Sequence, residues 1–395
     1  MEDSDCYICI MKYIFLYLKI FGLSGIIPDK LCKHESGRHS NKRQVIEFLI
    51  TLLSWGQFSF WFTLLVIEIK YGLGNTFHHL NFLKKYTNGI RFFLNFQTNL
   101  IFFYSCIQVI FNFIRNKDIA LQIVELWHKQ SQNKPYFSSK SGIPKVVRGS
   151  KIVGLCLPFI MIIVVIGITS LFKQIYREAI REIGYLRSLF CLILYVISFC
   201  YGFGIFMTAY IYVVFICFIS RNKFIEIANE LKTFKENPER IKYFKTIQSR
   251  HNSVCKLVEL FDNVFRYYIF LVYFHMLPLT CFMSYQALFE GRPAIITIAI
   301  ITVVLSMVLT FTSLTIICGS VTSAADYPRK IIHEIFNLEI PSEIRLQATI
   351  FLRRLNGPTI GYTCLNLFVI TKNTLSSMLS IFITYFLLYI QFMKE

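Results

Sequence analysis

The stretch TYFLLYIQF, residues 384–392, places a threonine and a glutamine seven residues apart in an otherwise apolar and aromatic run. Because seven residues are two turns of an α-helix, Thr384 and Gln391 point to the same side. The same line includes Leu388 and continues upstream through Ile381 and Ser377. The sequence therefore predicts an apolar helix with one seam of small polar and apolar side chains.

The composition of the whole chain is that of a membrane protein. Of its 395 residues, 55% are apolar and only 16% are charged, and the mean hydropathy is +0.53. A hydrocarbon core of ~30 Å requires ~20 helical residues, and a helix pairs all its backbone groups within the segment. We predict an all-α protein with seven transmembrane helices, at about residues 45–69, 89–114, 152–172, 188–220, 267–289, 294–317 and 370–393.

The N-terminal segment is hydrophobic but interrupted. Lys12, Lys19 and Pro28 fall within residues 7–28, so we expect a helix along the inner membrane interface rather than an eighth span. The acidic start lacks a positive n-region, so we expect no removable signal peptide. The chain then divides into an interfacial or cytosolic segment, the first six spans with their inner extensions, a cytosolic anchor region and the last helix, at residues 1–44, 45–317, 318–369 and 370–395.

The basic residues predict the orientation of the helices. The N-terminal segment and the loops at 115–151, 221–266 and 318–369 carry 30 lysines and arginines, whereas the alternate loops and the C-terminal tail carry 9. Because basic loops stay in the cytosol, the N-terminus is predicted to be cytosolic and the C-terminus extracellular. We assign the net charge of +18 to this orientation and expect no binding of nucleic acid. The orientation is opposite to that of a G-protein-coupled receptor.

Two of the inner loops have the pattern of packed helices. Between residues 222 and 260, and again between 323 and 355, apolar residues recur at helical spacing among charged ones. Pro341 and Ser342 mark the start of a helix in the second loop. We therefore predict that the spans extend into the cytosol and pack there as a helical domain.

The sequence has no pattern of an enzyme, a metal site or a cofactor site. It lacks a glycine-rich phosphate loop, G-x-S-x-G and H-E-x-x-H. Cys6 and Cys9 form a lone pair without a second pair at zinc spacing, and most other cysteines lie in predicted spans or cytosolic loops, which argues against a disulfide framework. We predict no catalytic residue, no metal and no cofactor.

Uncharged polar side chains in the spans predict a pocket for a small organic ligand, most of it in the outer half of the helical bundle. Serine and threonine in membrane helices commonly bond their own helix, so packing is the alternative for those residues, and for His275 it is a hydrogen bond between helices. The side-chain amides of asparagine and glutamine find hydrogen-bond partners within their own helix less easily. The candidate ligand residues are Asn95, Phe96, Gln97, Asn99, Tyr195, Ser198, Tyr201, His275, Tyr285, Gln286 and Thr302.

The seam of the last helix can line a water-filled bore only if several copies of the helix come together. One helix cannot enclose water, but copies around an axis can line a bore with small polar groups and close it by dewetting at an apolar ring. A closed ring of copies makes the protein a symmetric oligomer. The sequence therefore predicts a pore.

The motif T-Y, five hydrophobic residues, Q-F resembles the signature of the insect gustatory receptor family. Thr384, Tyr385, Gln391 and Phe392 match it in full. The preceding stretch FLRRLNGPTIGYTCLNLFVITKNTLSSMLS, residues 351–380, is also similar to that family. The resemblance in sequence covers about the last forty residues. The rest of the chain agrees with the family only in length and in the arrangement of its predicted helices.

The resemblance implies a tetrameric, ligand-gated, non-selective cation channel in the plasma membrane of gustatory neurons. It makes Phe392 the candidate gate and Gln391 the polar group of the open path, with Ser377 and Leu388 on the same pore seam, while Thr384 and Tyr385 hold the pore helix in place. The implied partners are a small tastant, bitter or plant-derived, permeant cations, membrane lipid, and identical or related subunits.

Three other functions are alternatives. A seven-span receptor coupled to a cytosolic transducer is opposed by the predicted orientation. A small-solute transporter is opposed because no internal repeat or pair of broken helices is evident. A sugar-sensing member of the same channel family is the third alternative, which the sequence leaves open.

Overall fold

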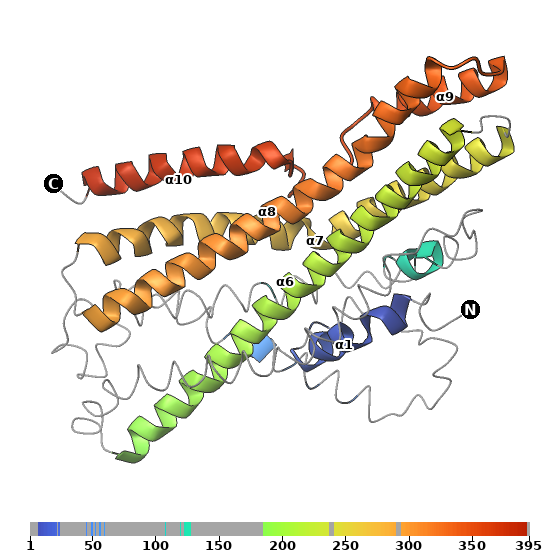
Figure 1. The fold of residues 1–395 in the computed structure, drawn as a ribbon. Coiled ribbons are helices and arrows are strands. Elements are labelled where there is room, and N and C mark those ends of the chain that lie inside the picture. Colours follow the sequence, from blue (N-terminus) through green and yellow to red (C-terminus); the bar gives the residue numbers. More distant parts are fainter. Residues whose placement is uncertain are drawn as a thin grey trace. The chain divides into compact units, whose positions relative to one another are not determined.

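The computed structural model describes residues 7–21, 23, 122–127, 185–236, 241–289 and 294–392, with eight single positions between 45 and 119. The predicted spans 45–69, 89–114 and 152–172 lie outside the described residues except at isolated positions. The secondary-structure elements are α1 (Tyr7–Ile20), α6 (Tyr185–Glu236), α7 (Ile241–Phe289), α8 (Ala294–Phe336), α9 (Ser342–Leu355), β1 (Thr363–Cys364), β2 (Phe368–Val369) and α10 (Lys372–Phe392), as Figure 1 shows.

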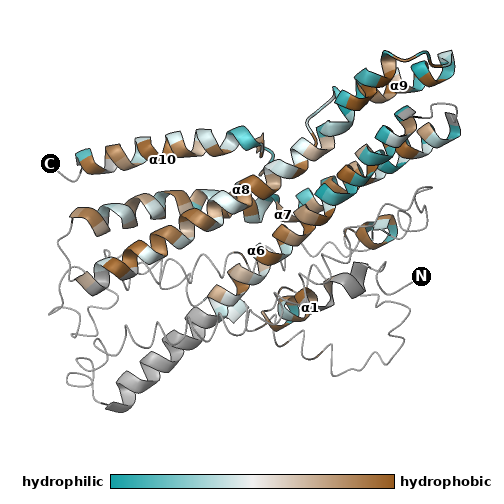
Figure 2. Ribbon diagram, viewed as in Figure 1, coloured by the Kyte–Doolittle hydropathy of each residue, from teal (hydrophilic) through white to brown (hydrophobic). Residues whose placement is uncertain are grey.

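Three of these helices are much longer than a membrane is thick. At 1.5 Å per residue the 52 residues of α6 span roughly 80 Å, against a hydrocarbon core of ~30 Å. Among the described residues, helices long and apolar enough to cross a membrane are Tyr201–Lys235, Lys242–Phe289 and Ile300–Phe336. Figure 2 shows that hydrophilic residues gather on α6, α7 and α8 toward the ends near α9. Each of the three is therefore one continuous helix longer than a span requires, while the predicted extension into the cytosol stays a prediction.

The chain forms two compact units, and each is described by itself. One comprises residues 11–117 and 148–211, and the other residues 1–10, 118–147 and 212–395. In the first, the Phe21 ring lies 5.9 Å from that of Tyr201 on α6, where a Cβ atom on Gly204 would collide with the Phe21 ring. α1 has 14 residues, which at about 21 Å is short of the ~20 residues a span needs. This length fits the predicted interfacial helix.

The second unit has an aromatic core where the extended helices meet. Phe234 of α6 lies 5.2 Å from Phe244 of α7, which lies 6.2 Å from Phe351 of α9, measured between ring centroids. The apolar positions picked out by helical spacing in the two inner loops are almost all buried. α9 begins at Ser342 with Pro341 as its N-cap, as predicted. Burial of such a face is what stabilises these helices.

The segment between α9 and α10 contains a hairpin that the sequence analysis did not predict. β1 and β2 are antiparallel, with Thr363 opposite Val369 and Cys364 opposite Phe368. At the turn Leu365 and Asn366 have φ of 51° and 60°. The hairpin escaped prediction because each strand has two residues and the turn lacks the Asn-Gly or Asp-Gly pair that normally supplies positive φ.

Candidate pore helix and its attachment

The last helix starts at a well-formed cap. The backbone N–H of Thr371 donates to Oγ1 of Thr374 at 2.9 Å, and the N–H of Thr374 donates to the carbonyl of Thr371 at 3.2 Å. This reciprocal pairing resembles a capping box, with threonine in place of glutamate. α10 then runs for 21 residues, about 32 Å and enough to cross a hydrocarbon core of ~30 Å. The predicted bounds of 370–393 differ from the observed ones by one or two residues.

One face of α10 packs on the other helices of its unit. α10 contacts α7 and α8, and Figure 1 shows it running alongside them. On this side the rings of Phe382 and Phe386 stack 6.1 Å apart, and the carbonyl oxygen of Phe382 accepts the thiol of Cys281 from α7 at 3.7 Å.

The predicted seam faces away from this packing. Its five members are all exposed within the described part of the chain: Ser377, Ile381, Thr384, Leu388 and Gln391. The Thr384 hydroxyl donates to the carbonyl of Ser380 at 2.9 Å, so it is satisfied inside its helix. Tyr385 is exposed as well, and the side chain of Phe392 lies outside the described residues. The seam is therefore open to lipid or to another copy of the chain.

The candidate ligand residues other than Thr302 fall into three groups. Asn95, Phe96, Gln97 and Asn99 lie outside the described residues, and the side chains of Tyr195, Ser198 and Gln286 lie outside them too. Tyr201, on the first unit, contacts Phe21. His275 and Tyr285 are half-buried on α7, where the Tyr285 ring stacks on Phe289 at 5.1 Å. The assignment of all these residues to a pocket stays a prediction.

The polar stripe of α8 bonds within its own helix. The Thr302 hydroxyl donates to the carbonyl of Ile298 at 2.9 Å, and Ser306, Thr310 and Ser313 donate to carbonyls three or four residues earlier. Such bonds satisfy a hydroxyl without a ligand. The packing alternative therefore accounts for these contacts, and the role of Thr302 in a ligand site stays a prediction.

A short linker, residues 356–371, joins α9 to α10 and is held by three helices. From α7, Asp262 accepts both the N–H and the hydroxyl of Thr363. From α6, the Ser220 hydroxyl lies 3.4 Å from that of Tyr362. From α8, the Thr322 hydroxyl donates to the carbonyl of Ile370 at 3.0 Å. The start of the candidate pore helix is thus attached to α6, α7 and α8.

Glycines allow the linker to approach α8 closely. A Cβ atom on Gly319 would lie 2.8 Å from the backbone carbon of Thr371, and one on Gly361 would collide with Thr322. Tyr362 is fully buried, and burial raises the pKa of its hydroxyl well above the ordinary value. Burial likewise raises the pKa of the Cys364 thiol to about 11. Both groups therefore stay neutral at physiological pH.

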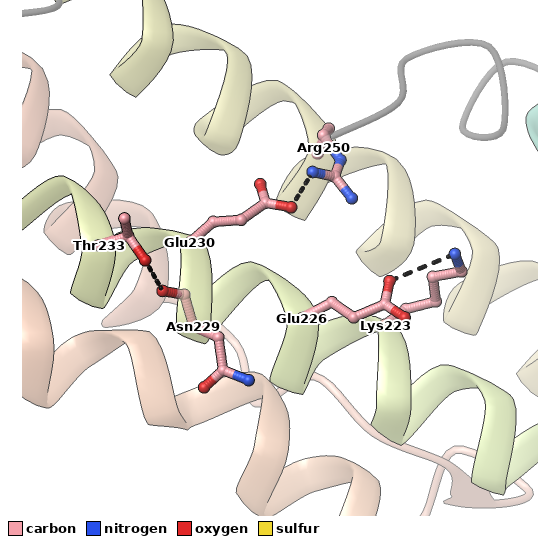
Figure 3. A network of polar contacts seen from close by, with 6 residues as sticks. All are labelled: Lys223, Glu226, Asn229, Glu230, Thr233 and Arg250. Atoms are coloured by element: carbon pink, nitrogen blue, oxygen red, sulfur yellow. Dashed lines mark hydrogen bonds and ion pairs between the residues drawn. The ribbon is translucent and has the colours of Figure 1, made fainter. Parts of the chain in front are cut away.

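Beyond the apolar stretches, a buried ion pair joins α6 to α7. Arg250 of α7 donates to Glu230 of α6, with exposures of only 8% and 6%. Figure 3 shows the pair beside the local contacts of Lys223 with Glu226 and of Thr233 with Asn229. Nearby, His251 is buried between the rings of Phe224 and Phe351, with centroids 5.3 Å and 5.1 Å away. No sequence pattern pointed to Glu230, Arg250 or His251.

Asp262 is also a residue that sequence reasoning missed. The available signal is an acidic residue flanked by Phe261 and Phe265 on a helix, because a carboxylate on a buried face needs a partner. Its partner Thr363 lies 101 residues away. The spacing along the chain does not reveal such a pair.

These features define a class of protein: a multi-pass helical membrane protein whose last apolar helix is attached by a short hairpin to three long helices. The sequence matches the family described as 7tm chemosensory receptors over residues 11–395. The chain therefore belongs to that family, which agrees with the resemblance found in its last helix and makes it a receptor rather than an enzyme.

The solved structures similar to this chain include insect olfactory receptors. The structure of the receptor OR5 from Machilis hrabei in complex with eugenol has a TM-score of 0.63 at 14% identity, covering 99% of this chain and 100% of that chain. A second OR5 structure has a TM-score of 0.58 at 14% identity, covering 96% and 97%. At this identity the similarity shows a shared fold. No curated protein matches the sequence significantly.

Proposed function

We propose that this protein is a gustatory receptor that acts as a ligand-gated, non-selective cation channel in the plasma membrane of sensory neurons. The observation that carries the proposal is the seam of α10, whose five members are exposed on a mostly apolar helix that packs on α7 and α8. A membrane helix with an exposed seam of small polar side chains gains most by facing a water-filled bore built from several copies.

In the proposed channel, four identical or related subunits surround the bore. Ser377, Thr384 and Gln391 supply uncharged polar groups, Leu388 an apolar ring, and Phe392 the gate near the outer end. A path lined by amides and hydroxyls admits hydrated cations with little selectivity, whereas an apolar ring closes it by dewetting. Tyr385, exposed on the protomer, packs against a neighbouring subunit. The match of Thr384, Tyr385, Gln391 and Phe392 to the gustatory motif supports taste over smell.

The proposed ligand is a small, largely aromatic organic tastant, bitter or plant-derived. The candidate pocket residues are aromatic or uncharged, which suits such a molecule, and OR5 has been solved with eugenol, itself a small aromatic compound. Binding opens the channel through a higher affinity for the open state. A sugar-sensing receptor of the same family is the second candidate, to be separated by the choice of ligand.

The direct test is electrical. We expect cells that lack other chemoreceptors and express this protein to pass an inward cation current when coumarin, caffeine, salicin or eugenol is applied. Sucrose and fructose in the same panel test the sugar alternative. Surface labelling confirms that the protein reaches the membrane. If no compound of the panel evokes a current although surface labelling finds the protein at the membrane, the proposed function is contradicted.

The orientation has a test of its own. Because 30 basic residues lie in the predicted inner loops against 9 in the outer ones, we expect an epitope on the C-terminus to be labelled on intact cells and one on the N-terminus only after permeabilisation. The reverse pattern would favour a receptor that signals through a cytosolic transducer.

A further inference from the structure

The contact between Asp262 and Thr363 engages both carboxylate oxygens of Asp262 and both the backbone N–H and the hydroxyl of Thr363. One carboxylate oxygen of Asp262 accepts the backbone N–H of Thr363 at 2.6 Å, and the other accepts its hydroxyl at 2.7 Å. Asp262 is only 8% exposed. Hydrogen bonds to a charged acceptor are short and strong, and a buried carboxylate without them is costly. We call this contact the clasp.

The clasp holds a turn that one of its own residues does not favour. Leu365 and Asn366 both have positive φ, which asparagine tolerates but leucine rarely adopts. The Thr363 hydroxyl accepts the N–H of Asn366 at 3.3 Å, which ties the turn to the clasp. Strained backbone of this kind persists only where its surroundings hold it.

The path from the clasp to the last helix is short. Thr363 pairs directly with Val369 across the hairpin, and the N–H of Ile370 donates to the carbonyl of Tyr362 at 2.8 Å. α10 begins at Lys372, three residues beyond Val369. A displacement of Asp262 is therefore transmitted to the first turn of α10 through the pairing of β1 with β2.

The other end of the path is the helix that carries candidate ligand residues. α7 is continuous from Ile241 to Phe289 and holds Asp262, His275 and Tyr285. Pro278 lies inside α7 between His275 and Tyr285, so a movement that a ligand causes near His275, on the same side of this proline as Asp262, is also a movement of Asp262.

We propose that Asp262 is a positioning residue for α10: through Thr363 and the β1–β2 hairpin it sets the first turn of the candidate pore helix relative to α7. A shift of α7 on ligand binding is thereby passed to the pore from its inner end, in addition to the direct packing around Phe382. The consequence for gating rests on the proposed channel function, whereas the positional role does not.

The positional role is tested on purified, full-length protein by limited digestion with trypsin. Lys372, the first residue of α10, is exposed. We expect Asp262→Asn and Thr363→Val to speed cleavage at Lys372 by about tenfold, the factor for losing one hydrogen bond to a charged group when cleavage follows local opening. Cleavage at Arg345, exposed on α9, serves as the internal reference.

Two matched variants control this experiment. Glu259→Gln changes an exposed carboxylate three residues before Asp262 on the same helix, and Thr363→Ser keeps the hydroxyl. Both should be cleaved like the wild type. If Asp262→Asn does not fold, Thr363→Val, which removes only the hydroxyl, still decides the result. Unchanged cleavage at Lys372 in Thr363→Val overturns the positional role.

The coupling role is tested with whichever of coumarin, caffeine, salicin or eugenol opens the wild-type channel. We expect the half-maximal concentration to rise about fivefold or more in Asp262→Asn and in Thr363→Val, within the usual range of coupling between sites. The double variant should be no worse than either single one, because both remove the same contact. The single-channel conductance should not change.

The outcomes separate the two proposals. Faster cleavage with unchanged gating overturns the coupling but leaves Asp262 as a positioning residue. If the effects of the two substitutions on the half-maximal concentration are additive in the double variant, the coupling through the clasp is overturned as well. A wild-type protein that passes no current counts against the proposed channel function, and cleavage at Lys372 then decides the positional role alone.

Discussion

We expect Gln391→Lys to abolish the ligand-evoked cation current and Gln391→Glu to preserve or increase it. Gln391 is exposed on the seam, so in the proposed tetramer each substitution places four charges around the bore. At an effective dielectric constant of about 20, one charge about 10 Å from a permeating cation contributes about 1.7 kcal/mol. Four lysines therefore reduce cation entry far more than tenfold, since each ~1.4 kcal/mol is a factor of ten.

The measurement is whole-cell current divided by surface protein, with Gln391→Asn as the neutral control. We expect the asparagine variant to conduct, because an amide remains on the seam. Phe392→Ala tests the gate separately and should raise the current at rest. Equal currents from the lysine, glutamate and asparagine variants, together with an unchanged Phe392→Ala, would remove α10 from the pore.

We expect Arg250→Ala to destabilise strongly the packing of α6 against α7. Arg250 and Glu230 are both buried, so the substitution leaves a carboxylate without its partner in the core between α6 and α7. Breaking a buried ion pair in this way costs about 3–5 kcal/mol, a large share of a typical unfolding free energy of about 5–15 kcal/mol. We expect a large fall in thermal stability in detergent and in the amount of protein at the cell surface.

An exposed ion pair in the same chain provides the matched control. Lys235 and Glu334 bond at 2.7 Å, but their side chains are 38% and 56% exposed, and such solvent-exposed pairs contribute little to stability. Lys235→Ala should therefore change the thermal stability and the amount of surface protein very little. The double variant Glu230→Met with Arg250→Met should recover much of the loss, because an apolar pair leaves no buried charge. Similar stabilities for Arg250→Ala and Lys235→Ala would contradict the importance of the buried pair.

The long helices show how far the sequence alone reaches. Hydropathy located α10 to within one or two residues, and apolar residues at helical spacing predicted that α6, α7 and α8 extend past the membrane. The start of α9 at Ser342 followed from Pro341. Each of these features depends on residues a few positions apart, within one helix.

The attachment of α10 was beyond sequence reasoning for a definite physical reason. Asp262 and Thr363 are 101 residues apart, and no local period relates them. Leu365 adopts positive φ against its own preference, because the contacts of the hairpin hold it there. Glu230 and Arg250 likewise read as ordinary charges in a polar loop until α6 and α7 pack together.

The sequence by itself therefore determined that this is a multi-pass helical membrane protein of the chemosensory receptor family, where its last helix runs, and which of its side chains form the seam. Hydropathy, helical period and a terminal motif are local properties, and they can be read without knowing the fold. Only the tertiary structure decided which polar groups meet, and hence that Asp262, Ser220 and Thr322 together hold the start of α10. Such contacts exist only once distant helices pack and water is excluded between them.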